Sequence, residues 1–503
     1  MYPLIAPRRA LWIALSTALL AGCTTVGPDF SAPAAPTVPG YTRQSLPART
    51  ASAPGAMGGA QSFSAAAVPG DWWAQFGSAK LDTLIAQGLR NSPSLAAAQA
   101  SLRQAEQTYA AQAGSTLYPT VTSKLGASRN QTNSSSFGQS GSATNTYNLY
   151  NASVAVNYNL DLFGSNRRAL EALAAQVDFQ RYQFDGARLT LAGNIVTAAF
   201  AQAQRGAQIQ ATEAILQAQR NQLDIARKRF ALGAAARADV LTLQTQVEQT
   251  RATLPPLRNQ LQQTDHLLAV LLGQAPGAAD IPRFDLAEFT LPARLPMVVP
   301  SELVRQRPDI QASTALLHAA TAQYGVAVSN LYPQINLSAG LGTQALTTGA
   351  LFGPGSLVWN LAGQLAQPLF NAGLKAGANA AHASLESAGA NYQQTVLQAL
   401  RNVADALRAL DNDAQTLAAQ AAADSSAQQS LQLVEDQYGL GAASYLQLLI
   451  AQQQAQQTRI GLIAAQAQRL ADSAALYQAM GGGVIGTNPA GSSAPMSVSS
   501  LSH

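Results

Sequence analysis

Two long stretches of the chain contain no proline, and they limit the possible fold more than any other feature. They cover residues 165–231 and 371–439. At ~1.5 Å per residue, a continuous helix of either length would be about 100 Å long, so it cannot belong to a compact domain. Apolar residues recur in the first stretch every seven positions, as in the seam of a coiled coil: Leu170, Val177, Phe184 and Leu191. We therefore expect long paired helices rather than several globular domains.

The sequence also repeats itself at an interval of about 200 residues, far longer than the ~20 to 50 residues of a solenoid repeat. Four landmarks recur in the same order, 207 to 215 residues later: Pro93 and Pro308, Pro119 and Pro333, Leu162-Phe163 and Leu369-Phe370, and Phe230-Ala231-Leu232-Gly233 and Tyr438-Gly439-Leu440-Gly441. We predict a tandem duplication, with repeat 1 at residues 76–280, an inter-repeat segment at 281–301 and repeat 2 at 302–480.

Each repeat contains a pair of segments with the two-residue alternation of β-strands, at about residues 119–163 and 333–369. A proline, Pro119 or Pro333, stops the preceding helix. Strands of ten or more residues, apolar on one face and neutral-polar on the other, are typical of transmembrane β-barrels around a wet lumen. A soluble β-sandwich is the alternative, but its strands are usually nearer ~5 to 6 residues. The polar or glycine-rich loops at 129–147 and 344–355 are expected outside the cell.

The N-terminus predicts export. Arg8 and Arg9 precede an apolar run at residues 11–22, which is shorter than the ~20 residues of a membrane-spanning helix, so residues 1–22 are interpreted as a signal peptide. Cys23, the only cysteine, follows Leu-Ala-Gly, and this tetrapeptide resembles the lipobox of bacterial lipoproteins. The resemblance implies cleavage before Cys23 and acylation, including palmitate. Because Thr24 replaces the aspartate typical of inner-membrane retention, it also implies the outer membrane. An incidental buried thiol is the alternative.

Residues 31–70 are rich in Pro, Ala, Ser and Gly with almost no charge, a composition that cannot bury enough surface to fold alone. We interpret residues 23–75 as an acylated, extended tether, and the Gly/Ser/Pro-rich residues 481–503 as a disordered tail. The net charge of +4 falls to 4 − 2 = +2 once the two signal-peptide arginines are removed. Without a basic patch, this balance gives no support for nucleic-acid binding.

No pattern in the sequence indicates catalysis. The four histidines show no metal-ligand spacing: His266, His318, His382 and His503. Zincin, nucleophile-elbow and Walker-type motifs do not occur. We therefore expect a protein that is not an enzyme, without catalytic residues, cofactor or metal site.

Several segments resemble outer-membrane efflux proteins of the TolC/OprM family, and the lipobox is similar to that of its NodT-type outer-membrane factor lipoproteins. These segments are Val26-Gly27-Pro28-Asp29-Phe30, Asp71-Trp72-Trp73-Ala74-Gln75-Phe76, Arg307-Pro308-Asp309-Ile310 and the two turns at Gly233 and Gly441. The resemblance covers about residues 20 to 480. It implies a mixed α and β membrane protein whose four transmembrane strands per chain complete a 12-stranded barrel in a homotrimer, continued by a long α-helical periplasmic barrel.

The number of strands also indicates that several chains assemble. Four strands leave two open sheet edges, which lipid does not tolerate, and natural barrels start at eight strands. Physics alone permits two, three or four chains, and the resemblance selects three. It further implies a passive duct in outer-membrane lipid that docks with a periplasmic membrane-fusion adaptor and, through it, an inner-membrane pump, exporting drugs or small toxic compounds. The alternatives are a type I protein-secretion duct of the same fold and a non-conducting coiled-coil structural lipoprotein.

The same resemblance assigns the periplasmic tip and gate. Its tip turns are matched by Phe230 and Gly233, and by Tyr438 and Gly441, although on geometry alone any helix-turn-helix would fit. Aspartates that ring the entrance in relatives are matched by Gln447 and Ile450, near Gln453. With Leu446, three copies of Ile450 are expected to form an apolar closure that gates by dewetting. Alternatively, Ile450 is coiled-coil core. Asp239 is expected to hold the tip shut by hydrogen bonding across helices.

Overall fold

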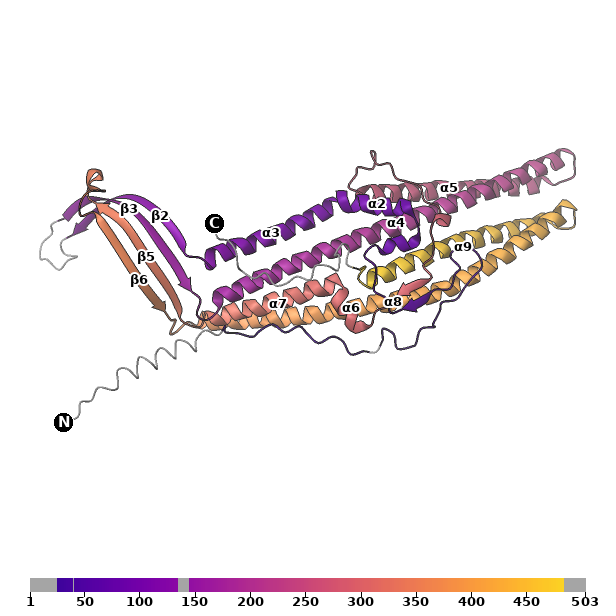
Figure 1. The fold of residues 1–503 in the computed structure, drawn as a ribbon. Coiled ribbons are helices and arrows are strands. Elements are labelled where there is room, and N and C mark those ends of the chain that lie inside the picture. Colours follow the sequence, from indigo (N-terminus) through magenta and orange to yellow (C-terminus); the bar gives the residue numbers. More distant parts are fainter. Residues whose placement is uncertain (1–24, 39, 134–143, 484–503) are drawn as a thin grey trace. The chain divides into compact units, whose positions relative to one another are not determined.

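The computed structural model describes residues 25–38, 40–133 and 144–483 (Figure 1). The predicted signal peptide, Cys23 and residues 484–503 of the predicted tail lie outside this range. Two compact units make up the chain. Unit 1 contains residues 25–33, Ser101–Arg181 and Ala312–Gln393, and unit 2 contains Ala34–Ala100, Tyr182–Gln311 and residues 394–483.

The same order of elements occurs in each half of the chain: helix, two strands, long helix, shorter helix. In the first half these are α3 (Pro93–Thr116), β2 (Thr120–Asn133), β3 (Thr144–Leu160), α4 (Ser165–Ala231) and α5 (Arg237–Leu271). In the second half they are α7 (Pro308–Ser329), β5 (Gln334–Ala345), β6 (Leu357–Ala366), α8 (Ala372–Gly439) and α9 (Tyr445–Ala479). The two long helices, α4 and α8, have 67 and 68 residues and occupy the proline-free stretches.

Shorter elements complete the chain. They are β1 (Ser62–Ser64), η1 (Trp72–Phe76), α2 (Ala79–Asn91), η3 (Leu286–Glu288), β4 (Arg294–Pro296), α6 (Pro300–Gln306) and η4 (Thr348–Ala350). Within the described ranges, no helix combines the length and the apolar character that crossing a membrane requires.

Unit 1 contains a four-stranded antiparallel sheet in the order β2-β3-β5-β6 (Figure 1). The pairing of β3 with β5, for example Val154 opposite Leu341, joins the strand pairs of the two halves. The outer strands β2 and β6 each have one edge without a partner strand in the described part of the chain. Large apolar side chains on this sheet are exposed, including Leu125 (86%) and Trp359 (75%).

The strands extend further than the sequence indicated. Residues 129–147 were expected to form a loop, but β2 continues to Asn133 and β3 begins at Thr144, with Arg129 opposite Asn148. The prediction was wrong there because backbone pairing continues through Asn, Gln and Thr residues, in which no apolar alternation marks a strand.

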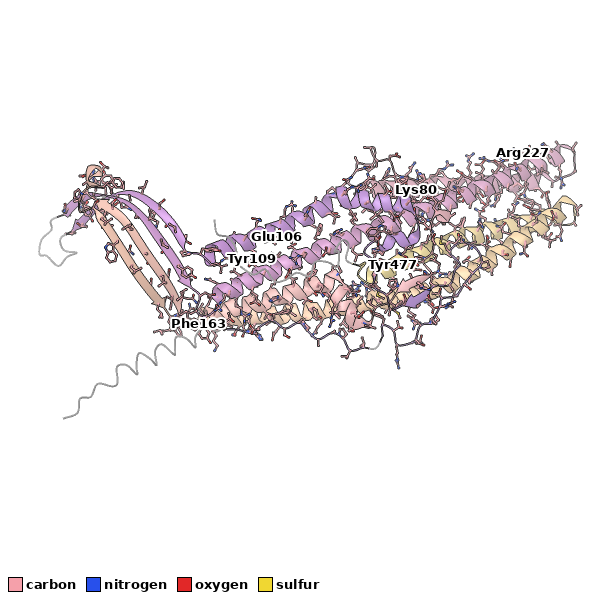
Figure 2. The ribbon with its side chains drawn as sticks, in the orientation of Figure 1. Lys80, Glu106, Tyr109, Phe163, Arg227 and Tyr477 are labelled. Carbon is pink, nitrogen blue, oxygen red and sulfur yellow. The ribbon has the colours of Figure 1, made fainter. Side chains whose placement is uncertain are left out.

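Unit 2 has an aromatic core around Trp72, which is fully buried. Its ring stacks on Tyr477 of α9 with 5.6 Å between ring centroids, and Phe76 packs edge-on against it at 6.3 Å. Phe200 of α4 extends the cluster, 4.9 Å from Phe76. Figure 2 labels Tyr477 among the helices of this unit. The segment that begins Asp71-Trp72-Trp73 therefore packs the C-terminal end of the tether against α4 and α9.

Residues 41–64 of the tether are extended and are held within unit 2. Strand β1 pairs in parallel with β4, placing Phe63 opposite Leu295, and the Tyr41 hydroxyl donates a hydrogen bond to the carbonyl of Val298 at 2.6 Å. Gln61 is fully buried. Residues 31–70 cannot fold alone, but this arrangement does not require them to, because the helices supply the surface against which they pack.

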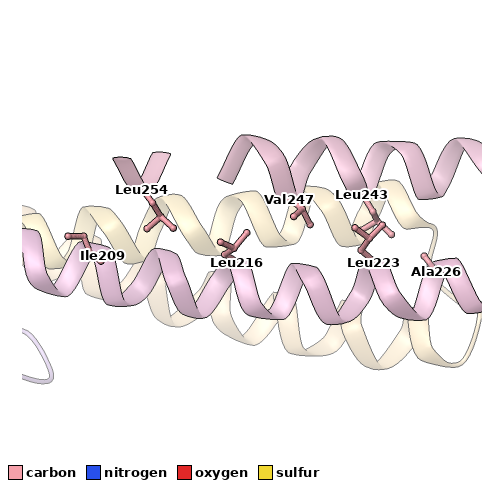
Figure 3. Close-up of a cluster of buried hydrophobic side chains, with 7 residues drawn as sticks. All are labelled: Ile209, Leu216, Leu223, Ala226, Leu243, Val247 and Leu254. Atoms are coloured by element: carbon pink, nitrogen blue, oxygen red, sulfur yellow. The ribbon is translucent and has the colours of Figure 1, made fainter. Parts of the chain in front are cut away.

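The α4–α5 hairpin packs through a heptad-like seam (Figure 3). On α4 the buried residues follow a seven-residue spacing, Ile209, Leu216 and Leu223, and they meet Leu243, Val247 and Leu254 of α5. This spacing keeps one face of a helix turned to its partner over many turns.

Candidate functional site

The two hairpin turns have the same backbone geometry. Gly233 (φ +73°) and Gly441 (φ +74°) adopt the left-handed conformation that favours glycine. In the first turn, the Ala234 amide donates to the Arg229 carbonyl at 2.8 Å and the Gly233 amide to the Phe230 carbonyl at 2.9 Å. The Ala442 amide donates to the Gln437 carbonyl at 2.8 Å and the Gly441 amide to the Tyr438 carbonyl at 3.1 Å. Each glycine thus ends a long helix with a Schellman motif.

Gln447 caps its own helix. Its Oε1 accepts a hydrogen bond from the Ser444 amide at 2.7 Å, and the Gln447 amide donates to Ser444 Oγ at 3.3 Å. This is a capping box, which satisfies two amides that the first turn of α9 would otherwise leave unpaired. In this structure the Gln447 side chain is therefore engaged at the start of α9.

Asp239 has a similar local bond. Its Oδ2 accepts from the Ala236 amide at 3.4 Å, at the start of α5. The hydrogen bond across helices that was expected of Asp239 is not among its contacts in the described structure, and that role stays a prediction.

Leu446 and Ile450 lie one helical turn apart on α9 and are exposed, at 63% and 57%. Leu448, between them in sequence, is buried at 1%. Gln453 turns toward α5, where its Nε2 donates to Gln246 Oε1 at 3.3 Å. Leu446 and Ile450 thus form an apolar strip, called here the α9 strip, that does not belong to the core of its own chain.

Contacts that the sequence did not predict join the two hairpin ends. The Arg229 guanidinium of α4 lies 5.5 Å from the ring centroid of Tyr438 in α8. Within the second hairpin, the ring of Tyr445 lies 6.4 Å from that of Tyr438. Gln222 Nε2 donates to Glu435 Oε1 at 3.3 Å. Burial raises the pKa of Tyr445 to about 12. The sequence contains one signal for an aromatic contact at the hairpin ends: Phe230 and Tyr438 each lie three positions before a turn glycine.

Among the described residues, no group of three or more His, Cys, Asp or Glu side chains could hold a metal ion.

Known proteins share both the sequence pattern and this architecture. A family model described as outer membrane efflux protein matches residues 84–274 and 299–482. The chain is 30% identical over 481 residues to the antibiotic efflux pump outer membrane protein ArpC of Pseudomonas putida, covering 94% of this chain and 95% of ArpC. It is 28% identical over 417 residues to nodulation protein T of Rhizobium leguminosarum bv. viciae, covering 82% of this chain and 84% of that protein.

Two solved structures have the same fold. The outer-membrane channel OprN superposes with a TM-score of 0.82 at 26% identity, covering 92% of this chain and 100% of that chain. The outer membrane protein VceC of Vibrio cholerae gives 0.76 at 26% identity, covering 83% of this chain and 100% of that chain. The expected mixed α and β outer-membrane channel fold is confirmed. The chain therefore belongs to the outer membrane efflux protein family, and it is an outer-membrane duct of a tripartite efflux system.

Proposed function

We propose that three copies of this chain form a passive duct, in which four strands from each copy complete a 12-stranded barrel and the hairpins continue it as a helical barrel. The observation that carries this proposal is the four-stranded sheet, whose outer strands β2 and β6 have unpaired edges in the single described chain. Its exposed leucine and tryptophan side chains support a lipid-facing surface. In lipid an open strand edge leaves backbone groups unsatisfied, so the sheet requires closure by further copies.

The duct would export drugs or small toxic compounds, as suggested by the antibiotic efflux for which one relative is named. A periplasmic membrane-fusion adaptor would connect it to an inner-membrane pump, which supplies the energy. The hairpin ends would form the periplasmic entrance, with the exposed α9 strip as its gate. The tandem duplication fits this role, because the order helix, strand pair, long helix and shorter helix recurs.

Assembly is the direct test. The purified protein in mild detergent should have the protein mass of three chains, and the monomer should appear only on denaturation. Native mass spectrometry or light scattering corrected for bound detergent measures this mass. A folded, stable monomer in lipid would contradict the duct and would favour the non-conducting coiled-coil lipoprotein.

We also propose that Cys23 is acylated and anchors the chain. The first described residues, which follow Cys23 in the sequence, are held within unit 1: the Val26 amide donates to the carbonyl of Phe163, which lies between β3 and α4, at 3.1 Å (Phe163 is labelled in Figure 2). Asp29 forms an ion pair with the buried Arg168 at 2.6 Å, and Phe30 stacks on His318 at 4.3 Å.

Replacing Cys23 with serine should abolish incorporation of labelled palmitate, since no other cysteine exists in the chain. Trimers should still form, because a closed barrel is itself a strong membrane anchor. The matched control is Ser31→Ala, outside the lipobox, which should keep its label. Palmitate retained by the serine variant would remove the lipoprotein assignment.

A further inference from the structure

Helices α3 and α8 connect directly to the two edge strands of the sheet in unit 1. Helix α3 ends at Thr116, just before β2 begins at Thr120, and α8 begins at Ala372, just after β6 ends at Ala366. Figure 1 shows both helices meeting the same end of the sheet. The chain runs toward the sheet in α3 and away from it in α8, so the two helices have opposite directions.

The helices of unit 1 follow the order of the strands to which they connect. Glu171 of α4 contacts His318 of α7 at 2.8 Å, and the ring of Tyr324 in α7 lies 5.2 Å from that of His382 in α8. The neighbours α4, α7 and α8 thus repeat the order β3, β5 and β6. Helix α8 lies on the β6 side of this layer and α3 on the β2 side, so α4 and α7 separate them.

Both outer helices have a face that their own chain leaves exposed. From Ser101 to Thr116 of α3, all of which the structure describes, no residue is buried, and from Ala372 to Asn391 of α8 only Ala378 is buried. Exposed residues recur on each helix at alternating intervals of three and four positions, as in a coiled coil. The α3 stripe consists of Arg103, Gln107, Ala110 and Gly114. The α8 stripe consists of Gly373, Ala376, Ala380, Ala383, Ser387 and Ala390.

The two stripes are complementary in spacing. The four residues of the α3 stripe lie 13, 9, 6 and 2 positions from Thr116, and the six residues of the α8 stripe lie 1, 4, 8, 11, 15 and 18 positions from Ala372. In an antiparallel pair, each side chain of the α3 stripe would therefore fall between two of the α8 stripe, as in knobs-into-holes packing. The small residues of the α8 stripe let the helix axes approach closely.

The charges on the two faces are complementary at the same levels. Arg103 and Glu386 lie 13 and 14 positions from the helix ends, and Glu106 and His382 each lie 10 positions from them. At ~1.5 Å per residue these levels are about 20 and 15 Å from the sheet. Neither Arg103 nor Glu106 forms an ion pair within the described part of the chain. Glu386 is 69% exposed and has only His382 of its own helix nearby, at 3.5 Å.

We propose that α3 of one copy packs antiparallel against α8 of the next copy, with Arg103 opposite the partner's Glu386 and Glu106 opposite the partner's His382. This inference rests on the assembly proposed above and adds the contact that sets its register. Backbone pairing of β2 with β6 alone permits slippage, because strand pairing repeats at every two residues. Exposed ion pairs add little stability, so the charges act by selecting one helix register.

Disulfide formation between copies tests the register. In a Cys23→Ser background, the introduced cysteines are the only ones in the chain. Gln107→Cys with Ala380→Cys should give linked dimers and trimers on oxidation, because these positions lie 9 and 8 residues from the helix ends. Since α4 and α7 separate α3 from α8 within one copy, such a disulfide joins two copies. Non-reducing electrophoresis measures the yield.

The matched control combines Gln107→Cys with Ala390→Cys. Ala390 lies on the same face of α8 as Ala380, but about 15 Å further along the helix. A disulfide needs Cα atoms about 4.4–6.8 Å apart, so this pair should link at background level.

Charge reversal tests the ion pair. Arg103→Glu should raise the dissociation constant of each interface on the order of fivefold at low salt, measured by native mass spectrometry on dilution. Adding Glu386→Arg should restore the natural value. Arg181→Glu is the control and should leave dissociation unchanged, since Arg181 is 55% exposed and pairs with Asp178 of its own helix.

Three outcomes with an intact trimer would overturn the proposed register. One is the absence of a disulfide between positions 107 and 380, and another is a higher yield for positions 107 and 390. The third is a double charge variant that dissociates as readily as Arg103→Glu alone. Absence of the trimer mass before oxidation would instead contradict the proposed assembly, so the two failures are distinct.

Discussion

Replacing Trp72 with alanine should lower the free energy of unfolding of unit 2 by about 3–5 kcal/mol, the usual cost of truncating a fully buried aromatic side chain. Trp72 is 0% exposed and contacts Tyr477 and Phe76 at ring-centroid distances of 5.6 and 6.3 Å. The loss combines the transfer free energy of the ring with the cavity that remains. Because Trp72 lies near the C-terminal end of the tether, the substitution should also weaken the packing of residues 50–64 in unit 2.

Thermal or denaturant unfolding of the detergent-solubilised protein measures this effect. Trp72→Phe is the matched control, since it keeps an aromatic ring against Tyr477 and leaves a smaller cavity. Phe230→Ala, at the exposed first hairpin turn, should change the stability far less, because Phe230 is 45% exposed. If the alanine and phenylalanine variants of Trp72 unfold at the same temperature or denaturant concentration, contacts of the Trp72 ring do not stabilise this unit.

The long helices could be read from the sequence because their limits depend on local chemistry. Absence of proline permits α4 and α8 to continue, and Gly233 and Gly441 end them through a backbone conformation that other residues rarely adopt. Strands were equally readable where apolar and polar residues alternate. They were missed at Asn133 and Thr144, because a polar strand end carries no such signal.

The site was predictable only in part. The exposed α9 strip follows from matching Leu446 and Ile450 to a turn motif, but the local bond of Gln447 was overlooked although Ser-x-x-Gln before an apolar run is a capping-box signature. The contact between the buried Arg469 and the tether could not be found in this way. The hydrogen bond from Arg469 to Gln61 joins residues 408 positions apart, and no local pattern encodes such a contact.

At the proposed entrance, Ile450→Asp should raise the preference of the duct for cations. Ile450 is 57% exposed in the single chain, so three copies near the axis would present three negative charges to a passing ion. In water each unit charge within about 7 Å of the ion contributes roughly 0.6 kcal/mol, and three contribute nearly 2 kcal/mol. The same charges raise the energy of an anion by an equal amount, so the cation-to-anion permeability ratio should rise on the order of a hundredfold at low salt, measured from reversal potentials in planar bilayers, and the rise should shrink as salt screens the charges.

Ile450→Asn separates charge from loss of apolar surface, because it adds a polar group of similar size and no charge. If the α9 strip closes the duct by excluding water, Ile450→Asn and Leu446→Ser should both raise the open conductance without changing ion preference, and only Ile450→Asp should change both. If Ile450 instead packs against a helix of a neighbouring copy, all substitutions at this position should weaken the trimer, and detergent mass measurements would detect it. Folded, trimeric variants with unchanged conductance and selectivity would exclude the α9 strip as the gate.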